Sequence, residues 1–308
     1  MGADLDRLVE LLDLEPLEVN LFRGVSPADG RVRVFGGQVL AQALVAAART
    51  VDADRHVHSL HSYFLRPGDP AVPIVFEVDR IRDGRSFATR RVVAIQHGRA
   101  IFNLQASFQV FEDGPDHADS MPDVVAPDTI ARTDVRPPTA EARRLGAAAG
   151  EAGEAEPRDQ PIDVRFVQGP HWAGRGAREP DQDVWMRADG ALPDDPVVHA
   201  SVVAYCSDLM LLGTSTLPHR GLVPDDDAGF MIASLDHAMW FHRRCRADEW
   251  LLYHCHSPSA AGARGFSRGE VFRPDGVLCV SIAQEGLVRP LSSGHPRDEP
   301  SEPNASRG

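Results

Sequence analysis

The sequence contains no lysine, and all 32 of its basic residues are arginines. Without a side-chain amine, the chain can form neither a Schiff base nor a Walker-type phosphate loop. Cysteine is scarce, and no two cysteines are spaced as a CxxC pair. We therefore expect reduced thiols in a cytoplasmic protein and no disulfide scaffold.

Long apolar runs and an excess of positive charge are absent as well. No run approaches the ~20 residues that span a bilayer, and residues 1–20 lack the basic and apolar regions of a secretory signal. The 32 basic and 45 acidic residues give a net charge of −13, which disfavours binding to nucleic acid. The final residues, ASRG, are not a peroxisomal SKL-type signal. We expect no membrane or nucleic-acid partner and a cytoplasmic location.

The first half of the chain has a helix followed by strands. Residues 4–13 carry their apolar side chains on one helical face, and residues 35–50 are apolar nearly all round, as in a helix buried on most sides. One strand is expected at 14–23. Turn signals separate four further strands, expected at 56–66, 73–81, 86–96 and 100–111. A buried helix followed by an antiparallel meander is an α+β unit.

The same pattern returns in the second half. Two strands precede an apolar helix at 193–213, which we expect Asp195 to cap and Pro196 to begin. Gly98 and Gly276 fall at matching turns, 178 positions apart, which indicates a tandem duplication. The strands are expected at 162–168, 182–188, 234–243, 250–258, 264–273 and 277–288.

These patterns divide a chain of 308 residues, about twice a typical domain of ~100–200 residues, into two units. The expected N-terminal unit is 1–112 and the C-terminal unit is 161–290. The linker at 113–160 is rich in Ala, Glu, Gly and Pro and is expected to be partly disordered. Residues 291–308 are expected to form a flexible tail.

Several catalytic motifs are missing. The sequence has no GxSxG elbow, no HExxH motif, no P-loop and no GxGxxG turn. Four histidines of the second half lack carboxylate or cysteine partners at recognised ligand spacing, so strand histidines are a simpler interpretation than a metal site. We expect no metal and no other cofactor. These histidines are His237, His242, His254 and His256.

Asp208 is the most informative polar residue. Its neighbours one helical turn away are uncharged, and a carboxylate on such a face costs free energy unless it is hydrogen-bonded or has a task. A position near a frayed helix end, facing water, would also explain it. Ser234 opens a strand and Gln284 interrupts an apolar run, and each alone also fits an ordinary strand residue.

Seven sequence blocks occur in order: FGGQVLAQAL, VHSLHSYFLRPGD, RDGRSFATRRVVAIQ, AYCSDLMLL, SLDHAMWFHR, WLLYHCHSPSAAGARGF and DGVLCVSIAQEGLVR. Together they resemble the acyl-CoA thioesterase II family over about 4–112 and 161–290. The resemblance implies a double hotdog fold, an α+β architecture of two tandem units. In each unit an antiparallel sheet wraps around a long central helix.

The resemblance also implies a site. In that family an Asp, a Thr or Ser and a Gln position the hydrolytic water, and they map by motif onto Asp208, Ser234 and Gln284. The implied reaction is hydrolysis of fatty acyl-CoA to free fatty acid and coenzyme A. Asp208 would be the general base, and the other two would orient the water. Ser at position 234, where many members have Thr, keeps the hydroxyl group.

Candidates for substrate binding are less specific. His58 lies in a matching block, although a structural histidine also fits. Arg264 and Arg268 could pair with coenzyme A phosphates because arginine binds phosphate bidentately, and a solvated strand face also explains them. The donors for the thioester oxygen are expected among backbone N–H groups near a helix start.

Two other function classes remain open. A hotdog enoyl-CoA hydratase would need an Asp and a His on one segment, and Asp208 has no His within a turn. A non-catalytic acyl-CoA binding protein is expected to have lost one of the three polar residues, and all three are present. Because only the second half carries them, we expect one site per chain and a structural first half. Hotdog units commonly pair through sheet edges, so a homo-oligomer is expected.

Overall fold

The computed structural model describes five stretches of the chain, residues 3–28, 30–133, 160–170, 176–222 and 230–290. The first half contributes two helices and six strands to this part. They are α1 (Ala3–Leu12), β1 (Glu15–Glu18), β2 (Leu21–Gly24), α2 (Gly36–Ala48), β3 (Arg55–Phe64), β4 (Ile74–Asp83), β5 (Phe87–Gln96) and β6 (Arg99–Val110). The single strand predicted at 14–23 is wrong. Asn20 adopts a left-handed conformation with φ 63° and turns the chain, so β1 and β2 form a hairpin.

The second half repeats the helix-and-strands arrangement. Asp195 caps its main helix by accepting a hydrogen bond from the Val197 N–H at 2.8 Å, and Pro196 is in the first turn, as predicted. The elements are β7 (Ile162–Phe166), β8 (Asp181–Ala188), α4 (Pro196–Ser207), α5 (Leu211–Thr214), η2 (Leu217–Leu222), β9 (Phe230–Ser234), β10 (Asp236–Phe241), β11 (Leu251–Ala261), β12 (Arg264–Phe272) and β13 (Leu278–Pro290). The helix predicted at 193–213 is interrupted between α4 and α5, and the short strand β9 was not predicted.

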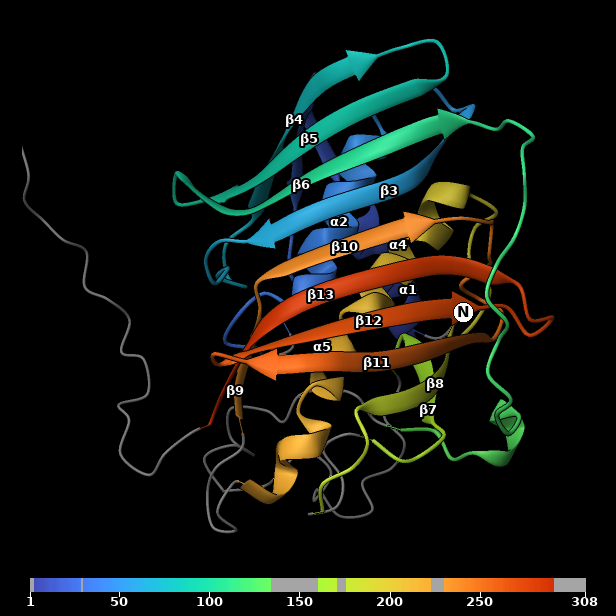
Figure 1. Ribbon diagram of the computed structural model, residues 1–308. Coiled ribbons are helices and arrows are strands. Elements are labelled where there is room, and N and C mark those ends of the chain that lie inside the picture. The colour runs from blue at the N-terminus through green and yellow to red at the C-terminus, as the bar shows by residue number, and fades with distance from the viewer. Residues whose placement is uncertain (1–2, 29, 134–159, 171–175, 223–229, 291–308) are drawn as a thin grey trace, which may run out of the picture.

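Thirteen antiparallel strands of the described stretches form one continuous sheet (Figure 1). From edge to edge the order is β1-β2-β4-β5-β6-β3-β10-β13-β12-β11-β8-β7, and β9 pairs with β13 outside this path. The two halves join where β3 pairs with β10, with His61 opposite Ala238. The duplicated units therefore share a single sheet.

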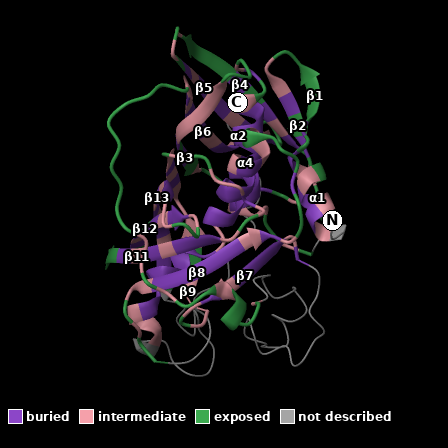
Figure 2. Cartoon of the chain, turned by 90° about the vertical axis from the view of Figure 1, so that its right-hand side faces the viewer, coloured by how far each residue is buried: buried purple, intermediate pink, exposed green. Residues whose placement is uncertain are grey.

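The two long helices lie side by side against the inner face of the sheet (Figures 1 and 2). Residues 37–47 of α2 are all buried, as its nearly continuous apolar sequence predicts. Residues 196–214 are long and apolar enough to span a membrane, but 72% of that apolar window is buried inside the fold. Both helices belong to one hydrophobic core that extends through the two halves. Burial of the helices between the sheet and α1 explains their composition.

The first part of the predicted linker is packed against the fold. The indole Nε1 of Trp185 donates to the carbonyl of Val125 at 2.9 Å, and Met121, Val124 and Ile130 cover a small apolar cluster with Trp185. This cluster lies on the outer face of the sheet, because the alternate residues of β8 face the main core. The prediction of partial disorder concerns mainly 134–159, which lie outside the described residues.

Candidate active site

Three polar side chains from the second half meet at the end of α4. The amide Nε2 of Gln284 donates to Asp208 Oδ1 at 2.6 Å, and Ser234 Oγ donates to the same oxygen at 3.0 Å. Gln284 Nε2 also donates to Ser234 Oγ at 2.9 Å. The structure therefore brings together the three residues that the sequence nominated. Asp208 does not simply face water at a frayed helix end, as the alternative interpretation supposed.

The direction of these hydrogen bonds leaves the side-chain oxygen of Gln284 without a donor. Both protons of the Gln284 amide are used, one toward the carboxylate and one toward the Ser234 hydroxyl. The opposite amide orientation would place an oxygen against the carboxylate, so the bonding pattern fixes the amide. Gln284 Oε1 is buried and has no hydrogen-bond partner within the described residues. No described residue therefore uses this acceptor.

Local backbone structure explains why the three residues converge. Asp208 is the C-terminal cap of α4, so its side chain leaves the helix at the point where the chain turns toward α5. Ser234 is the last residue of β9 and pairs with Gly286, two positions from Gln284 on β13. A Cβ atom at Gly286 would lie 2.4 Å from a methyl carbon of Leu212, so a larger residue would push α5 away.

The first half also reaches this site, through the start of α2. An ideal Cβ at Gly36 would lie 2.4 Å from Asp208 Oδ2, and one at Gly37 would lie 2.4 Å from the carbonyl oxygen of Tyr205. The backbone N–H of Gly37 donates to the Asp208 carboxylate. Only glycine allows this close approach. The prediction that the first half has a purely structural role did not include this contact.

Burial sets the protonation of the carboxyl group. Asp208 is partly exposed as a residue, but its carboxyl group is enclosed by protein, and this burial raises its pKa to about 6. Hydrogen bonds from Gln284, Ser234 and the Gly37 N–H oppose the rise because they stabilise the charged form. The group is a carboxylate at neutral pH and accepts a proton more readily than an ordinary aspartate.

Known proteins resemble this chain over most of its length. The acyl-CoA thioesterase family model matches residues 156–287, and the model of the acyl-CoA thioesterase N-terminal domain matches residues 25–109. Mouse acyl-coenzyme A thioesterase 8 is 44% identical over 292 residues, which cover 92% of this chain and 88% of the mouse protein. The chain belongs to the acyl-CoA thioesterase family.

Solved structures that resemble this chain support both the family assignment and the fold. A structure described as acyl-CoA thioesterase II TesB2 from Mycobacterium marinum is 44% identical, with a TM-score of 0.74, and covers 93% of this chain and 100% of that chain. A protein of hot dog fold from Alicyclobacillus acidocaldarius, 19% identical, has a TM-score of 0.71 over 92% of this chain and 98% of its own. The double hotdog fold predicted from the sequence is confirmed.

In this thioesterase family member, His58 lies away from the three residues. Its Nε2 is 2.8 Å from Ser107 Oγ on β6, and its ring packs edge-on against Phe87 at 5.6 Å between centroids. Burial lowers the pKa of His58, which favours the neutral ring. These contacts describe a histidine held between strands of the first half. A role in substrate binding stays a prediction.

The two arginines proposed for coenzyme A also lie apart from the site. Strand alternation along β12 buries Ser267 on the side of Gln284 and exposes Arg264 and Arg268 on the other side of the sheet. Arg264 pairs with Glu285 at 2.9 Å, and Arg268 lies 5.6 Å above the Phe266 ring centroid. The structure does not bring them together with Asp208, and phosphate binding stays a prediction.

Sequence reasoning missed Ser267. It pairs with Gln284 across β12 and β13, is fully buried, and its hydroxyl has no partner among the described residues. Cross-strand partners on one face have Cβ atoms about 5 Å apart, so this hydroxyl is a neighbour of the Gln284 amide. The strand pattern could have placed Ser267 on the inner face, but only the register identifies its partner.

The four histidines considered above as metal ligands contact other side chains. His254 and His256 have Asp partners on β8, Asp183 at 2.8 Å and Asp181 at 2.7 Å. His237 and His242 are hydrogen-bonded to serines. Among the described residues no group of three or more His, Cys, Asp or Glu side chains could hold a metal ion.

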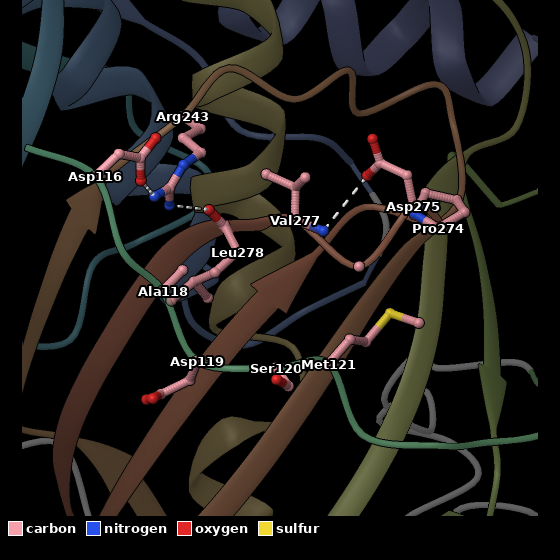
Figure 3. A pocket seen from close by; sticks show the side chains of 11 residues that line it. Asp116, Ala118, Asp119, Ser120, Met121, Arg243, Pro274, Asp275, Val277 and Leu278 are labelled. Atoms are coloured by element: carbon pink, nitrogen blue, oxygen red, sulfur yellow. Dashed lines mark hydrogen bonds and ion pairs between the residues drawn. The ribbon is translucent and has the colours of Figure 1, made fainter. Parts of the chain in front are cut away.

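Two cavities lie away from the catalytic candidates. The larger, of about 600 Å³, is open and lies on the outer face between residues 116–121 and the β12–β13 turn (Figure 3). Arg243 lines one end of it, bonded to Asp116 and, at 2.9 Å, to the carbonyl of Leu278 (Figure 3). The smaller, of about 320 Å³, lies between α1, the end of α2 and the start of α4. Neither is lined by Asp208.

Proposed function

We propose that this chain hydrolyses fatty acyl-CoA to a free fatty acid and coenzyme A by direct attack of water. The names of its relatives support the substrate class. The observation that carries the mechanism is the convergence of Gln284 and Ser234 on one oxygen of a buried carboxylate. This arrangement fixes a base and leaves an acceptor, Gln284 Oε1, for a second proton of the same water.

Asp208 acts as the general base in this proposal. Its carboxylate removes one proton from water while Gln284 Oε1 accepts a hydrogen bond from the other, so an oxygen lone pair is directed at the thioester carbon. General-base catalysis typically contributes about 10²–10⁴-fold. Ser234 donates its proton to Asp208 and accepts one from Gln284, so it orients the base and the amide together.

The reaction then proceeds through a tetrahedral intermediate. The new C–O bond forms as the carbonyl electron pair moves to oxygen, and the C–S bond breaks when this pair returns. The proton held by Asp208 goes to the leaving thiolate, which yields coenzyme A. Developing charge on the thioester oxygen requires a donor, and we place one at the first turn of α2, whose positive dipole end lies beside Asp208. The Gly37 N–H already donates to Asp208, and the next two N–H groups of α2 donate to the Phe35 carbonyl, so the Gly36 N–H is the donor we assign.

Release of free thiol from a series of acyl-CoA substrates tests the proposal. The purified chain is expected to turn over several acyl chain lengths and to release one thiol for each carboxylic acid formed. Binding of acyl-CoA without thiol release would instead favour the non-catalytic binding protein. Hydration of an enoyl-CoA without thiol release would favour the hydratase.

We further propose the two-unit division at 1–112 and 161–290, with one active site in the second unit, and a homo-oligomer. All four cysteines are free thiols, which supports a reducing, cytoplasmic location. Size-exclusion chromatography with light scattering tests the oligomer, and a monomeric mass would contradict it.

A further inference from the structure

Ser207 directly precedes Asp208 in the sequence, at the point where α4 ends. It is the last residue of α4, and the next helix begins only at Leu211. The carbonyl of Ser207 and the N–H of Asp208 belong to the same planar peptide unit. Whatever orients the Ser207 carbonyl therefore orients the backbone that carries the Asp208 side chain.

Hydrogen bonds hold Ser207 through its carbonyl and its hydroxyl, and the hydroxyl also lies 3.7 Å from the Met239 sulfur. The Tyr253 hydroxyl donates to the Ser207 carbonyl at 3.1 Å, and Ser207 Oγ donates to the carbonyl of Ala204 at 2.8 Å. His237 Nε2 lies 2.8 Å from Ser207 Oγ. Because the single hydroxyl proton goes to Ala204, the imidazole donates from Nε2. Ser207, His237 and Tyr253 are all 0% exposed, so these bonds do not exchange with solvent.

The two partners of Ser207 are themselves fixed by the sheet. Tyr253 stands on β11, and Gly269 on β12 leaves room for its ring, since a Cβ there would lie 2.3 Å from a ring carbon. His237 stands on β10, and its carbonyl accepts a hydrogen bond from Ser62 Oγ on β3 at 2.8 Å. The support of Ser207 thus extends across the junction between the two halves.

We propose that Ser207 is a positioning residue for Asp208, and that Tyr253 and His237 hold it in place. This inference rests on the proposed function, in which Asp208 is the base. None of the three touches the bonds that change in the reaction. They fix the direction in which the carboxylate leaves α4, and a misplacement of about 1 Å can cost about 100-fold in rate.

The Tyr253→Phe variant is the cleanest first test, because it removes one hydroxyl and keeps the ring beside Gly269. We expect kcat to fall about tenfold or more with KM within about twofold of wild type. Tyr63→Phe, at an exposed position on β3, is the matched control and should keep full activity. Equal kcat values for wild type and Tyr253→Phe would overturn the role of Tyr253.

A pair of serine variants separates positioning from stability. Ser207→Ala is compared with Ser201→Ala, a buried serine of the same helix whose hydroxyl has no partner among the described residues. Only Ser207→Ala should lower kcat. Ser207→Ala alone leaves the His237 Nε2–H without an acceptor and should lower the melting temperature. The double variant Ser207→Ala/His237→Leu removes this donor as well, so it should recover the melting temperature that the single variant loses. It should not recover kcat.

Recovery of kcat together with melting temperature in the double variant would contradict positioning, because it would show that Ser207 acts on stability alone. The Asp208→Asn variant distinguishes this failure from failure of the proposed function. If Asp208→Asn is inactive while Ser207→Ala and Tyr253→Phe keep full kcat, the base assignment stands and the positioning role is wrong. If Asp208→Asn is fully active, the proposed function itself is wrong.

Discussion

Gln284 Nε2 lies 2.6 Å from Asp208 Oδ1, although the two residues are 76 positions apart and lie on different layers of the fold. One is on β13, the last strand along the chain, and the other caps a helix packed against the sheet. Charge-assisted bonds of this length are strong and directional. The contact defines where a water molecule and a thioester would meet in the proposed reaction.

Removal of the residues that orient the water should affect turnover more than binding. Ser234→Ala and Gln284→Ala are expected to lower kcat at least about tenfold with little change in KM, because they act on the base and the water. Ser234→Thr keeps the hydroxyl and should stay within about threefold. Steady-state kinetics with one acyl-CoA measures both constants. An unchanged kcat with a large rise in KM would assign the residue to substrate binding.

The close approach of α2 gives a prediction for the first half. Gly36→Ala would place a methyl group 2.4 Å from Asp208 Oδ2, so the carboxylate or the helix must move. We expect kcat to fall at least about tenfold. Gly114→Ala is a suitable control, because no heavy atom lies within 4 Å of its Cβ position. Full activity of Gly36→Ala would show that the start of α2 has no part in the site.

Activity should depend on pH through Asp208. Its pKa of about 6 means that the base is protonated and inactive below that pH, so kcat/KM should fall about tenfold per pH unit on the acidic side. A profile measured between pH 4.5 and pH 8 checks this. A profile that stays flat down to pH 4.5 would indicate an exposed carboxylate with the ordinary aspartate pKa of 3.8.

The same group links stability to pH. Its pKa is raised in the folded state, so its favourable contribution is complete below the unfolded value of 3.8 and is lost as pH rises through about 6. The difference corresponds to at most about 3 kcal/mol at neutral pH. The melting temperature of Asp208→Asn minus that of wild type should therefore be larger at pH 7.5 than at pH 4. An equal difference at both pH values would contradict the burial of the charge.

Each chain should bind one acyl-CoA at a catalytic site. The C-terminal cap of α4 is Asp208, whereas the corresponding cap of α2 is Arg49, which cannot act as a base at neutral pH. Calorimetric titration of the protein with a non-hydrolysable acyl-CoA thioether should give one site per chain. Two equal sites per chain would show that the first half binds substrate independently.

Sequence patterns predicted most of the architecture, because apolar alternation and turn residues act locally. The positions of β3 to β6 and the cap at Asp195 follow from such signals. The end of α4 at Ser207 does not, since the apolar pattern resumes at Leu209, directly after Asp208, and only packing decides where the helix stops. Short β9 was missed for a similar reason, because its pairing with β13 is a tertiary contact.

The site was predictable only in part. Resemblance to a family nominated Asp208, Ser234 and Gln284, and the structure brings them within hydrogen-bonding distance. The approach of Gly36 depends on how two helices pack, which no local pattern reports. Arg264 was nominated by residue type alone. Its strand position places it on the face opposite Gln284, a consequence of register that the motif does not contain.

Hydrolysis by the Asp208→Asn variant tests the central claim most directly. The change is nearly isosteric, and it removes the base while an amide can still occupy the space between Gln284 and Ser234. With wild-type protein as reference and the melting temperature as a check on folding, thiol release from acyl-CoA should fall at least about 100-fold at pH 7.5. Thiol release within threefold of wild type by the folded variant would contradict the assignment of Asp208 as the base.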